Sequence, residues 1–379
     1  MITKPKIIAL YLPQFHQIQE NDEFWGEGFT DWITVKNAKP IFEEHIQPRV
    51  PLNNNYYDLS QEKSVMWQAE LAHEYGIYGF GVYHYWFNND KNLLTKPAEI
   101  MRDSKSLPTN YFLAWDNISW KRSWSNVVGN DWAPMMDKQQ GSTDNTNGVR
   151  LLVPYILGSE SDWRNHYDYV RTHFMSPNYI KDNNKPIFAI LNYSPTMKEM
   201  CECWDKWAKE DGFDGMCFFF KSNIYSNRLK DSYKYDYEPH TVGWDKATIV
   251  HRAYNRVLRM MNIDPRKDVR IYDYDELWNK ILAFAKKHDE PYFLHGSFVC
   301  YDDSPRRGKS KSIIVKGGTP DKFKKYMKLL IDISIKQNKE YILLTAWNEW
   351  GEGAYLEPDT INEYKYLKAL KQAIGDGCF

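Results

Sequence analysis

Eight short apolar runs divide the chain, and each is followed by a polar segment. In several runs, such as "YILLTAW", apolar residues occupy consecutive positions rather than alternate ones. Strands buried on both faces have this pattern, which is typical of parallel sheets covered by helices. We therefore predict eight parallel strands, within residues 6–13, 76–87, 110–117, 185–193, 213–221, 233–239, 292–301 and 341–347. The run at 233–239 is polar and ends in Pro239.

Amphipathic helices separate several of these runs. Helical periodicity predicts them within residues 61–76, 275–288, 319–336 and 361–375, with Thr319 as an N-cap and Gly375 as a stop. Alternating strands and helices predict an α/β fold, a single (β/α)8 TIM-type barrel. An open doubly wound sheet is less favoured, because no Gly-rich phosphate fingerprint follows the first run. No linker or repeat interrupts residues 1–379, so we expect one catalytic domain. Long loops at 12–60 and 116–160 would lie at the C-terminal face of the barrel.

Composition excludes several partners. The net charge of −1 gives no reason to expect nucleic acid or a membrane surface. No apolar run approaches the ~20 residues that span a bilayer, and the first residues lack the pattern of a signal peptide. We expect a cytoplasmic protein, or a periplasmic or secreted one if a leader has been removed. The aromatic fraction is high, at 16% with 15 Trp and 27 Tyr, which suits a groove that stacks against sugar rings.

The segment "LLTAWNEWGEGAYLEPD" carries the strongest candidate chemistry. Glu349 and Glu352 follow the eighth run, where the catalytic face of a barrel forms, and Gly351 and Gly353 permit turns that would bring both carboxyls into one pocket. Two neighbouring carboxyls flanked by indoles titrate apart, so one keeps its proton. Glycoside cleavage needs an acid and a base or nucleophile in this arrangement. Helix capping or pairing with Arg is the alternative role for such a pair.

Polar and aromatic residues also follow the other strands. Any single one of them is more often core or rim, and their shared position after successive strands is the informative feature. The predicted substrate-binding residues are Tyr11, His16, Trp25, Trp32, His84, Tyr85, Trp86, Trp115, Asp116, Asn117, Trp120, Glu238, His240, Asp302, Arg306, Trp347 and Asn348. For Trp25 and Trp32, a packed loop with its own small core is an equal alternative.

Metal and cofactor motifs are weak. The "DYD" at 273–275 resembles the paired aspartates of metal-dependent nucleotide-sugar transferases, but it directly precedes a helix, where Asp is a favoured N-cap. The five Cys show no metal-ligand spacing, and the chain contains no P-loop, HExxH or GxSxG. We predict no metal and no cofactor.

Five motifs resemble a known family: "YLPQFHQIQENDEFWGEGFTDW", "QAELAHEYGIYGFGVYHYWF", "AWDNISWKRSW", "DDSPRRG" and "AWNEWGEGAYLEPD". From Ile7 to about Tyr366, the chain looks like the WbsX-type proteins of bacterial surface-polysaccharide gene clusters, such as O-antigen clusters, which are often labelled glycosyltransferases. It is more distantly similar to endo-α-mannosidase-like glycoside hydrolases, which are (β/α)8 barrels.

The resemblance implies roles for the two glutamates. Glu349 would be the base that removes a proton from the sugar O2, and Glu352 the general acid on the leaving oxygen. The implied reaction is retaining, through a 1,2-anhydro sugar. The chain departs from the WbsX pattern at Asn117-Ile118-Ser119, where Asn-Glu-Asn is usual, at Asp31, where Glu is usual, and at Pro154-Tyr155, near a position that commonly has Glu-Gln. The missing acid at Asn117-Ile118-Ser119 implies a different sugar at one subsite, and the change at Asp31 is milder.

Three hypotheses follow from the sequence. The first is a retaining glycoside hydrolase that acts on a polysaccharide or oligosaccharide with mannoside-like or related linkages. The second is a glycosyltransferase or transglycosylase of surface-polysaccharide biosynthesis, which the absence of a convincing nucleotide-sugar motif disfavours. The third is a carbohydrate-binding barrel without activity, for which two adjacent carboxyls would have little use.

Overall fold

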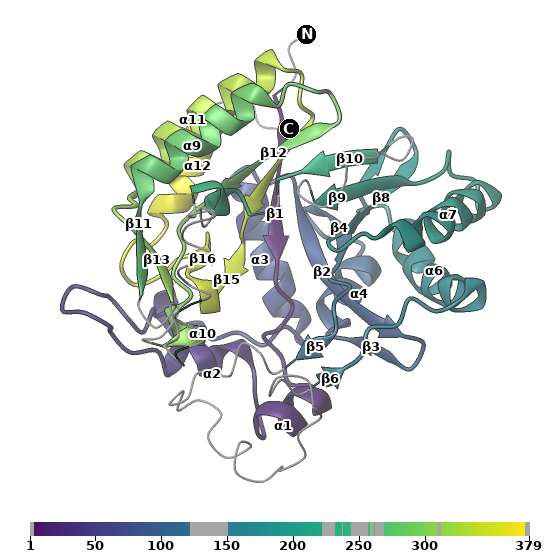
Figure 1. Cartoon of the computed structure of the whole chain (residues 1–379), viewed down its shortest axis with the longest axis horizontal. Coiled ribbons are helices and arrows are strands. Elements are labelled where there is room, and N and C mark those ends of the chain that lie inside the picture. The colour runs from purple at the N-terminus through teal and green to yellow at the C-terminus, as the bar shows by residue number, and fades with distance from the viewer. Residues whose placement is uncertain are drawn as a thin grey trace.

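Eight parallel strands close into a barrel at the centre of the molecule (Figure 1). The computed structural model describes residues 4–121, 151–221, 232–236, 238–243, 257, 261, 269–308 and 312–375. The barrel closes because β1 pairs with β2 on one side and with β14 on the other. Its strands are β1 (Lys6–Tyr11), β2 (Gly79–Asn88), β4 (Asn110–Trp115), β8 (Lys185–Ile190), β9 (Cys217–Lys221), β10 (Ser232–Tyr235), β12 (Phe293–Phe298) and β14 (Tyr341–Thr345).

The predicted TIM-type barrel is confirmed, and each of the eight predicted runs overlaps one barrel strand. The strands are buried on both faces, as their consecutive apolar residues predict: all of β14 is buried, and all of β4 except its first residue. The polar run at 233–239 contributes β10, the shortest strand of the barrel.

Helices cover the barrel on its outer side. In Figure 1, α9, α11 and α12 lie along one flank, and α6 and α7 lie on the other. The link from β9 to β10 consists of residues outside the described part of the chain. The helices are α1 (Gln19–Trp25), α2 (Asp31–Lys36), α3 (Glu62–Glu74), α4 (Lys96–Asp103), α6 (Glu160–Phe174), α7 (Lys198–Glu210), α9 (Tyr274–Lys287), α10 (Ser304–Arg307), α11 (Pro320–Lys336) and α12 (Lys365–Ile374).

Two helix starts show where local signals succeed and fail. Thr319 caps α11 as predicted, because its hydroxyl accepts the backbone N–H of Lys322 at 3.2 Å. The helix predicted from residue 361, in contrast, begins only at Lys365. The carboxylate of Asp359 accepts the backbone N–H of Ile361 and of Asn362, at 2.9 and 2.5 Å, and this turn displaces the helix start.

Short elements decorate the C-terminal ends of the strands. The long segment between β1 and α3 contains α1, α2 and the 3-10 turn η1 (Leu52–Asn54). The remaining short elements are β3 (Lys91–Leu93), β5 (Trp120–Lys121), β6 (Leu151–Val153), β7 (Lys181–Asp182), η3 (Pro195–Met197), η4 (Pro239–Gly243), β11 (Arg270–Asp273), β13 (Ile313–Lys316), β15 (Asn348–Glu349), η5 (Trp350–Glu352) and β16 (Ala354–Tyr355). In Figure 1, α1, α2, α10, β5 and β6 gather at the end toward which the β1 arrow points. This end carries the candidate site.

Membrane spanning is not a feature of the described helices. None of those in the ranges above is both long enough and apolar enough to cross a bilayer.

Candidate active site

The segment after β14 is anchored to the end of β1. The side-chain oxygen of Asn348 accepts the backbone N–H of Leu12 at 2.7 Å, and its amide nitrogen donates to the Leu12 carbonyl at 3.0 Å. The backbone N–H of Trp347 donates to the Leu10 carbonyl at 2.7 Å. The side chains of Trp347 and Asn348 are fully buried, so they fix the position of the segment that follows them. The chain then forms β15 and η5, which carry Glu349 and Glu352.

The carboxyl groups of Glu349 and Glu352 lie close enough for the charge of one to affect the other. Burial raises the pKa of Glu349 well above its usual value, and the charge of Glu352 raises that pKa further. The Tyr83 hydroxyl, which donates to Glu349 Oε1 at 2.6 Å, and the charge of Arg306 act in the opposite direction. A carboxyl group whose pKa is raised in this way keeps its proton more readily than an exposed carboxyl does. We call Glu349 and Glu352 the carboxyl pair.

Arg306 holds the second member of this pair. Its Nη1 donates to Glu352 Oε1 at 2.7 Å, and its Nη2 donates to Asp31 Oδ2 at 3.2 Å. The side chains of Arg306 and Asp31 are 19% and 3% exposed, so both charges are shielded from water. A β-carbon on Gly351 would lie 2.6 Å from Arg306 Nε and 2.7 Å from Asp31 Oδ2, which explains the glycine there.

The two glycines of this segment therefore serve different needs. Gly353 has a φ of +58°, as the prediction of a turn requires. Gly351 lies in the 3-10 turn η5 without a left-handed φ, so this turn does not need the conformational freedom of a glycine. Its missing side chain instead leaves room for Arg306 and Asp31 to approach the backbone.

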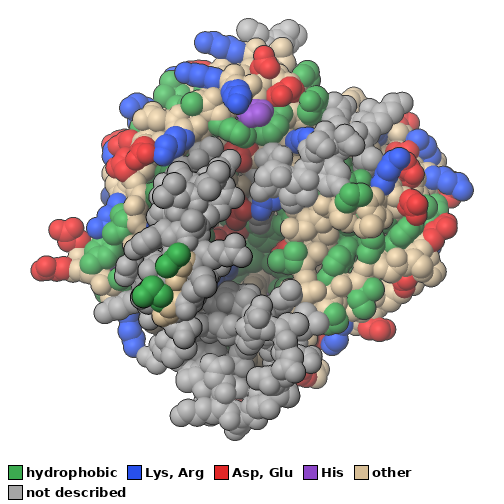
Figure 2. Space-filling view, in the orientation of Figure 1, with side chains coloured by type: hydrophobic (Ala, Val, Ile, Leu, Met, Phe, Trp, Pro, Cys, Tyr) green, Lys and Arg blue, Asp and Glu red, His purple; other side chains and the backbone are tan. Residues whose placement is uncertain are grey.

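The opposite wall combines tyrosines and acids. Tyr83 and Tyr85 point into the barrel from the same face of β2, because side chains alternate along a strand. Burial and the charges of Asp116 and Glu349 raise the pKa of Tyr85. Burial raises the pKa of Asp116 to about 7, against the charge of Lys221. Lys221 donates to Glu238 Oε2 at 2.7 Å. Figure 2 shows a hollow at the centre of this face, with acidic and basic side chains in its depth.

Glu357 anchors the segment that carries the carboxyl pair. Its carboxylate accepts hydrogen bonds from Tyr57 Oη at 2.7 Å, Gln68 Nε2 at 2.7 Å and Trp350 Nε1 at 2.6 Å. Tyr11 donates in turn to Gln68 Oε1 at 2.6 Å. Burial raises the pKa of Glu357 to about 7, and these donors restrain the rise. The Glu357 carboxylate is thus fully engaged by these partners, so its role is to hold the segment of the carboxyl pair in place.

We predict that Glu357→Gln destabilises the fold. The amide nitrogen of glutamine would face a donor where a carboxylate oxygen now accepts, and each buried group left unsatisfied costs about 1–3 kcal/mol. Thermal unfolding should show a lower melting temperature than in the wild type. Glu340→Gln is the control, because the Glu340 side chain is 40% exposed and its ion pair with Lys6, at 3.2 Å, lies near the surface, where such pairs contribute little stability. Equal melting temperatures for the two variants would contradict the supporting role.

Asp302 and His240, two of the predicted residues, pack close to the end of β12. Asp302 accepts hydrogen bonds at Oδ2 from Gln47 Nε2 at 2.8 Å and lies 2.8 Å from His45 Nε2. Burial raises the pKa of Asp302, but these hydrogen bonds outweigh it and leave the pKa below its usual value. Its role is to tie the loop after β1 to the loop after β12. His240 is buried and stacks on Tyr301, with ring centroids 4.3 Å apart.

His84, Trp86 and Trp115 do not join the carboxyl pair. His84 and Trp86 lie on the face of β2 opposite to Tyr83 and Tyr85, toward α6, where both rings pack against His166. Trp115 packs on the same His166 ring, with centroids 4.7 Å apart. Strand alternation therefore separates these three predicted residues from Tyr85 and Asp116.

Most aromatic residues of the first loop support the site from within the core. Trp32 packs against Trp350 with centroids 5.4 Å apart, and its Nε1 donates to the Tyr57 carbonyl at 2.8 Å. Trp25 instead packs on Phe29 in a small separate cluster, as the packed-loop alternative predicts. His16 is buried, and its Nδ1 lies 2.9 Å from the Pro13 carbonyl.

The two remaining predicted residues lie at the ends of β4 and β5. Asn117 bonds through its side chain to both the backbone N–H and the carbonyl of Asn192, each at 2.8 Å, so it joins the ends of β4 and β8. Trp120 packs edge-on against Tyr85, with centroids 5.4 Å apart.

Sequence reasoning missed three polar partners of this site: Asp31, Tyr83 and Lys221. Tyr83 could have been found, because it lies two residues before Tyr85 and shares its strand face. Asp31 is 275 residues away from Arg306 along the chain, and no local pattern connects them. Among the described residues, no cluster of three His, Cys, Asp or Glu side chains has the arrangement of a metal site.

A family model described as "Glycosyltransferase WbsX" matches residues 7–370. The chain belongs to the WbsX glycosyltransferase family. The proteins called WxcX in two strains of Xanthomonas campestris pv. campestris, both described as uncharacterized, are 26% identical to it over 378 residues. The alignment covers 97% of this chain and 49% of each relative, so the chain spans about half the length of those proteins.

Solved structures share the barrel of this WbsX family member. The GH99 endo-α-mannosidase from Bacteroides thetaiotaomicron superimposes with a TM-score of 0.51 at 15% identity, covering 97% of this chain and 96% of that one. A glycoside hydrolase-like protein superimposes with a TM-score of 0.57 at 11% identity, covering 100% and 96%. At these identities the likeness concerns the fold.

Proposed function

We propose that this WbsX family member is a glycoside hydrolase whose carboxyl pair, Glu349 and Glu352, cleaves glycosidic bonds. The observation that carries the proposal is the placement of both carboxyls at the mouth of the barrel within electrostatic reach of each other, with Arg306 bound to one of them and Tyr83 to the other. Acid–base cleavage needs one protonated and one ionised carboxyl. The raised pKa of Glu349 favours one protonated carboxyl in the pair.

The roles follow from the reaction that we propose. Glu349 takes the proton of the sugar O2 while Glu352 protonates the leaving oxygen, and O2 attacks the anomeric carbon to form a 1,2-anhydro sugar. Water then opens this ring, with the glutamates acting in reverse, and the anomeric configuration is retained. The raised pKa of Glu349 makes its carboxylate a stronger base once it is ionised.

Proton placement in the free protein differs from this working state. The raised pKa of Glu349 favours its protonated form, and Arg306 binds the carboxyl of Glu352 at 2.7 Å. The proposal therefore requires that substrate binding moves the proton from Glu349 to Glu352.

Transfer to a sugar acceptor is the second candidate function, and the name of the family is the observation in its favour. The "DYD" aspartates give little support for a nucleotide-sugar donor. Asp273 caps α9 by accepting the backbone N–H of Glu276 at 2.9 Å. Asp275 pairs with Lys322 and accepts from Tyr326 Oη, both at 2.6 Å. A transglycosylase that uses the carboxyl pair would need no such donor.

The deciding experiment is incubation with a panel of bacterial and fungal polysaccharides and oligosaccharides, including α-mannans, with products followed by NMR. We expect new reducing ends whose first-formed anomer has the configuration of the substrate. Products that appear only when an acceptor sugar is added would identify a transglycosylase instead. Inversion of the anomer would refute the anhydro route. No product from any glycan, together with tight binding of a nucleotide sugar in calorimetry, would refute the hydrolase.

A further inference from the structure

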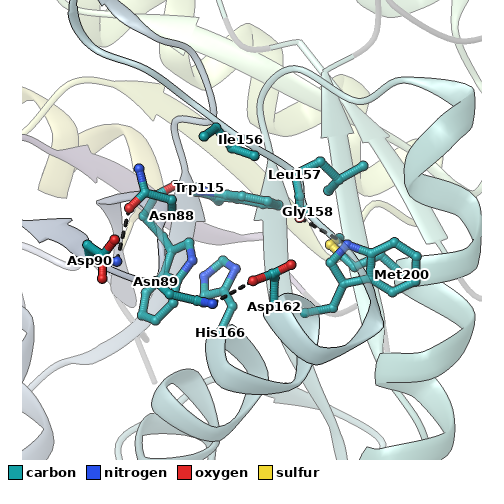
Figure 3. A pocket seen from close by; sticks show the side chains of 12 residues that line it. Asn88, Asn89, Asp90, Trp115, Ile156, Leu157, Gly158, Asp162, His166 and Met200 are labelled. Carbon is teal, nitrogen blue, oxygen red and sulfur yellow. Dashed lines mark hydrogen bonds between the residues drawn. The ribbon is translucent and has the colours of Figure 1, made fainter.

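A second cavity lies outside the barrel mouth, between the end of β2 and α6 (Figure 3). Its volume is about 240 Å³. Pockets for drug-sized ligands occupy roughly 300–1,000 Å³, so this cavity suits one small ring rather than a longer chain. The lining residues come from five segments of the chain and are Trp86, Asn88, Asn89, Asp90, Trp115, Ile156, Leu157, Gly158, Asp162, Trp163, His166 and Met200.

The floor of the cavity is a rigid group of aromatic rings. His166 stacks on Trp86 with centroids 4.5 Å apart and planes 8° apart, and Trp115 meets it edge-on. Behind it, His84 Nε2 lies 2.8 Å from His166 Nε2, so one ring donates and the other accepts. Burial lowers the pKa of both histidines, that of His84 to about 3. The floor is therefore uncharged and held in place from several sides.

The rim of the cavity is polar and partly open. Figure 3 shows Asn88, Asn89 and Asp90 on one side, facing Asp162 of α6. Asn89 Nδ2 donates to Asp162 Oδ1 at 2.5 Å across the opening. On the next side, Trp163 Nε1 donates to the Leu157 carbonyl at 3.0 Å and holds that loop over the cavity.

These groups match the chemistry of a neutral sugar. A pyranose presents C–H groups that pack on aromatic rings and hydroxyls that both donate and accept, and Asn and Asp side chains offer the complementary atoms. The twelve described lining residues include two aspartates and neither Lys nor Arg, so a phosphate or another anion would meet repulsion there.

We infer that the cavity between β2 and α6 is a second carbohydrate-binding site, which holds one neutral sugar unit. It lies on the outer side of β2, whereas Tyr83 and Tyr85 face the carboxyl pair from the inner side. A glycan bound in this cavity leaves the carboxyl pair free. The site therefore anchors a polymer beside the barrel mouth, and its binding does not depend on the proposed hydrolysis.

The test is binding of methyl glycosides to the full chain, followed by saturation-transfer NMR and calorimetry. The probes are the methyl α-glycosides of mannose, glucose, galactose and N-acetylglucosamine. Trp163→Ala should weaken the binding of at least one probe about tenfold, because it removes a lining ring, and Trp163→Phe should restore most of it. Asn89→Ala, at an exposed position, should weaken the same probe about twofold to tenfold.

Matched variants separate this site from the barrel mouth. Met175→Ala, 50% exposed just beyond the other end of α6, should bind every probe as the wild type does. Glu349→Gln should also keep the binding that Trp163→Ala loses, whether or not the protein hydrolyses glycans. The inference is overturned if no probe binds, or if Trp163→Ala and Asn89→Ala, both folded by thermal unfolding, bind every probe unchanged. If Trp163→Ala does not fold, unchanged binding to Asn89→Ala overturns it.

Discussion

Glu352→Gln should slow hydrolysis of a glycan by about 10²–10⁴-fold, the usual contribution of a general acid. The same variant should retain most of its activity on an aryl glycoside whose leaving group departs without a proton. Glu349→Gln should slow both substrates alike, because the sugar O2 still needs a base. Initial rates on the two substrate types measure this contrast directly.

The contrast also tests the role of each glutamate. The opposite pattern, in which Glu349→Gln spares the aryl glycoside, would make Glu349 the acid, in agreement with its raised pKa in the free protein. Near wild-type rates for both variants on a confirmed substrate would remove the carboxyl pair from the chemistry. Glu340→Gln is the matched control, because Glu340 directly precedes β14 at the opposite end of this strand from the carboxyl pair.

Arg306→Gln should shift the acidic limb of the pH profile of kcat/KM upward by about 1–3 units, the usual effect of losing a neighbouring opposite charge. The guanidinium charge lowers the pKa of Glu349, so its loss should raise that pKa further. The base then needs a higher pH to ionise. Activity at neutral pH should therefore fall.

Two further variants help to interpret the pH profile of Arg306→Gln. Arg306→Lys keeps the charge but loses the two-pronged contact with Glu352 and Asp31, so its rate should fall while its pH profile stays in place. Arg307→Gln changes the neighbouring arginine, which is 42% exposed and pairs with Asp303, and should leave the profile unchanged. An unshifted profile for Arg306→Gln would show that Arg306 does not tune the carboxyl pair. Removing Arg306 breaks its buried ion pair, which costs about 3–5 kcal/mol of stability. Thermal unfolding of each variant measures this loss and separates it from the change in the pH profile.

The barrel could be predicted because its evidence is local. Apolar residues at consecutive positions mark strands buried on both faces, and Thr319 with Pro320 marks a helix start. The same local evidence failed at residues 361–364, where the Asp359 carboxylate takes two backbone N–H groups and delays α12. Helical periodicity does not register a competing turn of this kind.

The candidate site was predicted in part. Position after a strand indicated the segment with Glu349 and Glu352, and the structure places Tyr85, Asp116 and Arg306 around it. The same rule also selected His84, which points the other way. The sequence shows that a residue lies near the end of a strand. It does not show whether the side chain faces the inside or the outside of the barrel, because that depends on the register of the alternation along the strand.

By itself, the sequence determined the order of strands and helices, and with it the face on which polar side chains gather, since these depend on residues near one another along the chain. Only the tertiary structure decided which of these side chains meet. Arg306 reaches Asp31 from 275 residues away, Tyr83 reaches Glu349 across the barrel, and Trp86 and His166 form the floor of a separate cavity. Such contacts arise from barrel closure and helix packing, which bring together residues that share no local pattern.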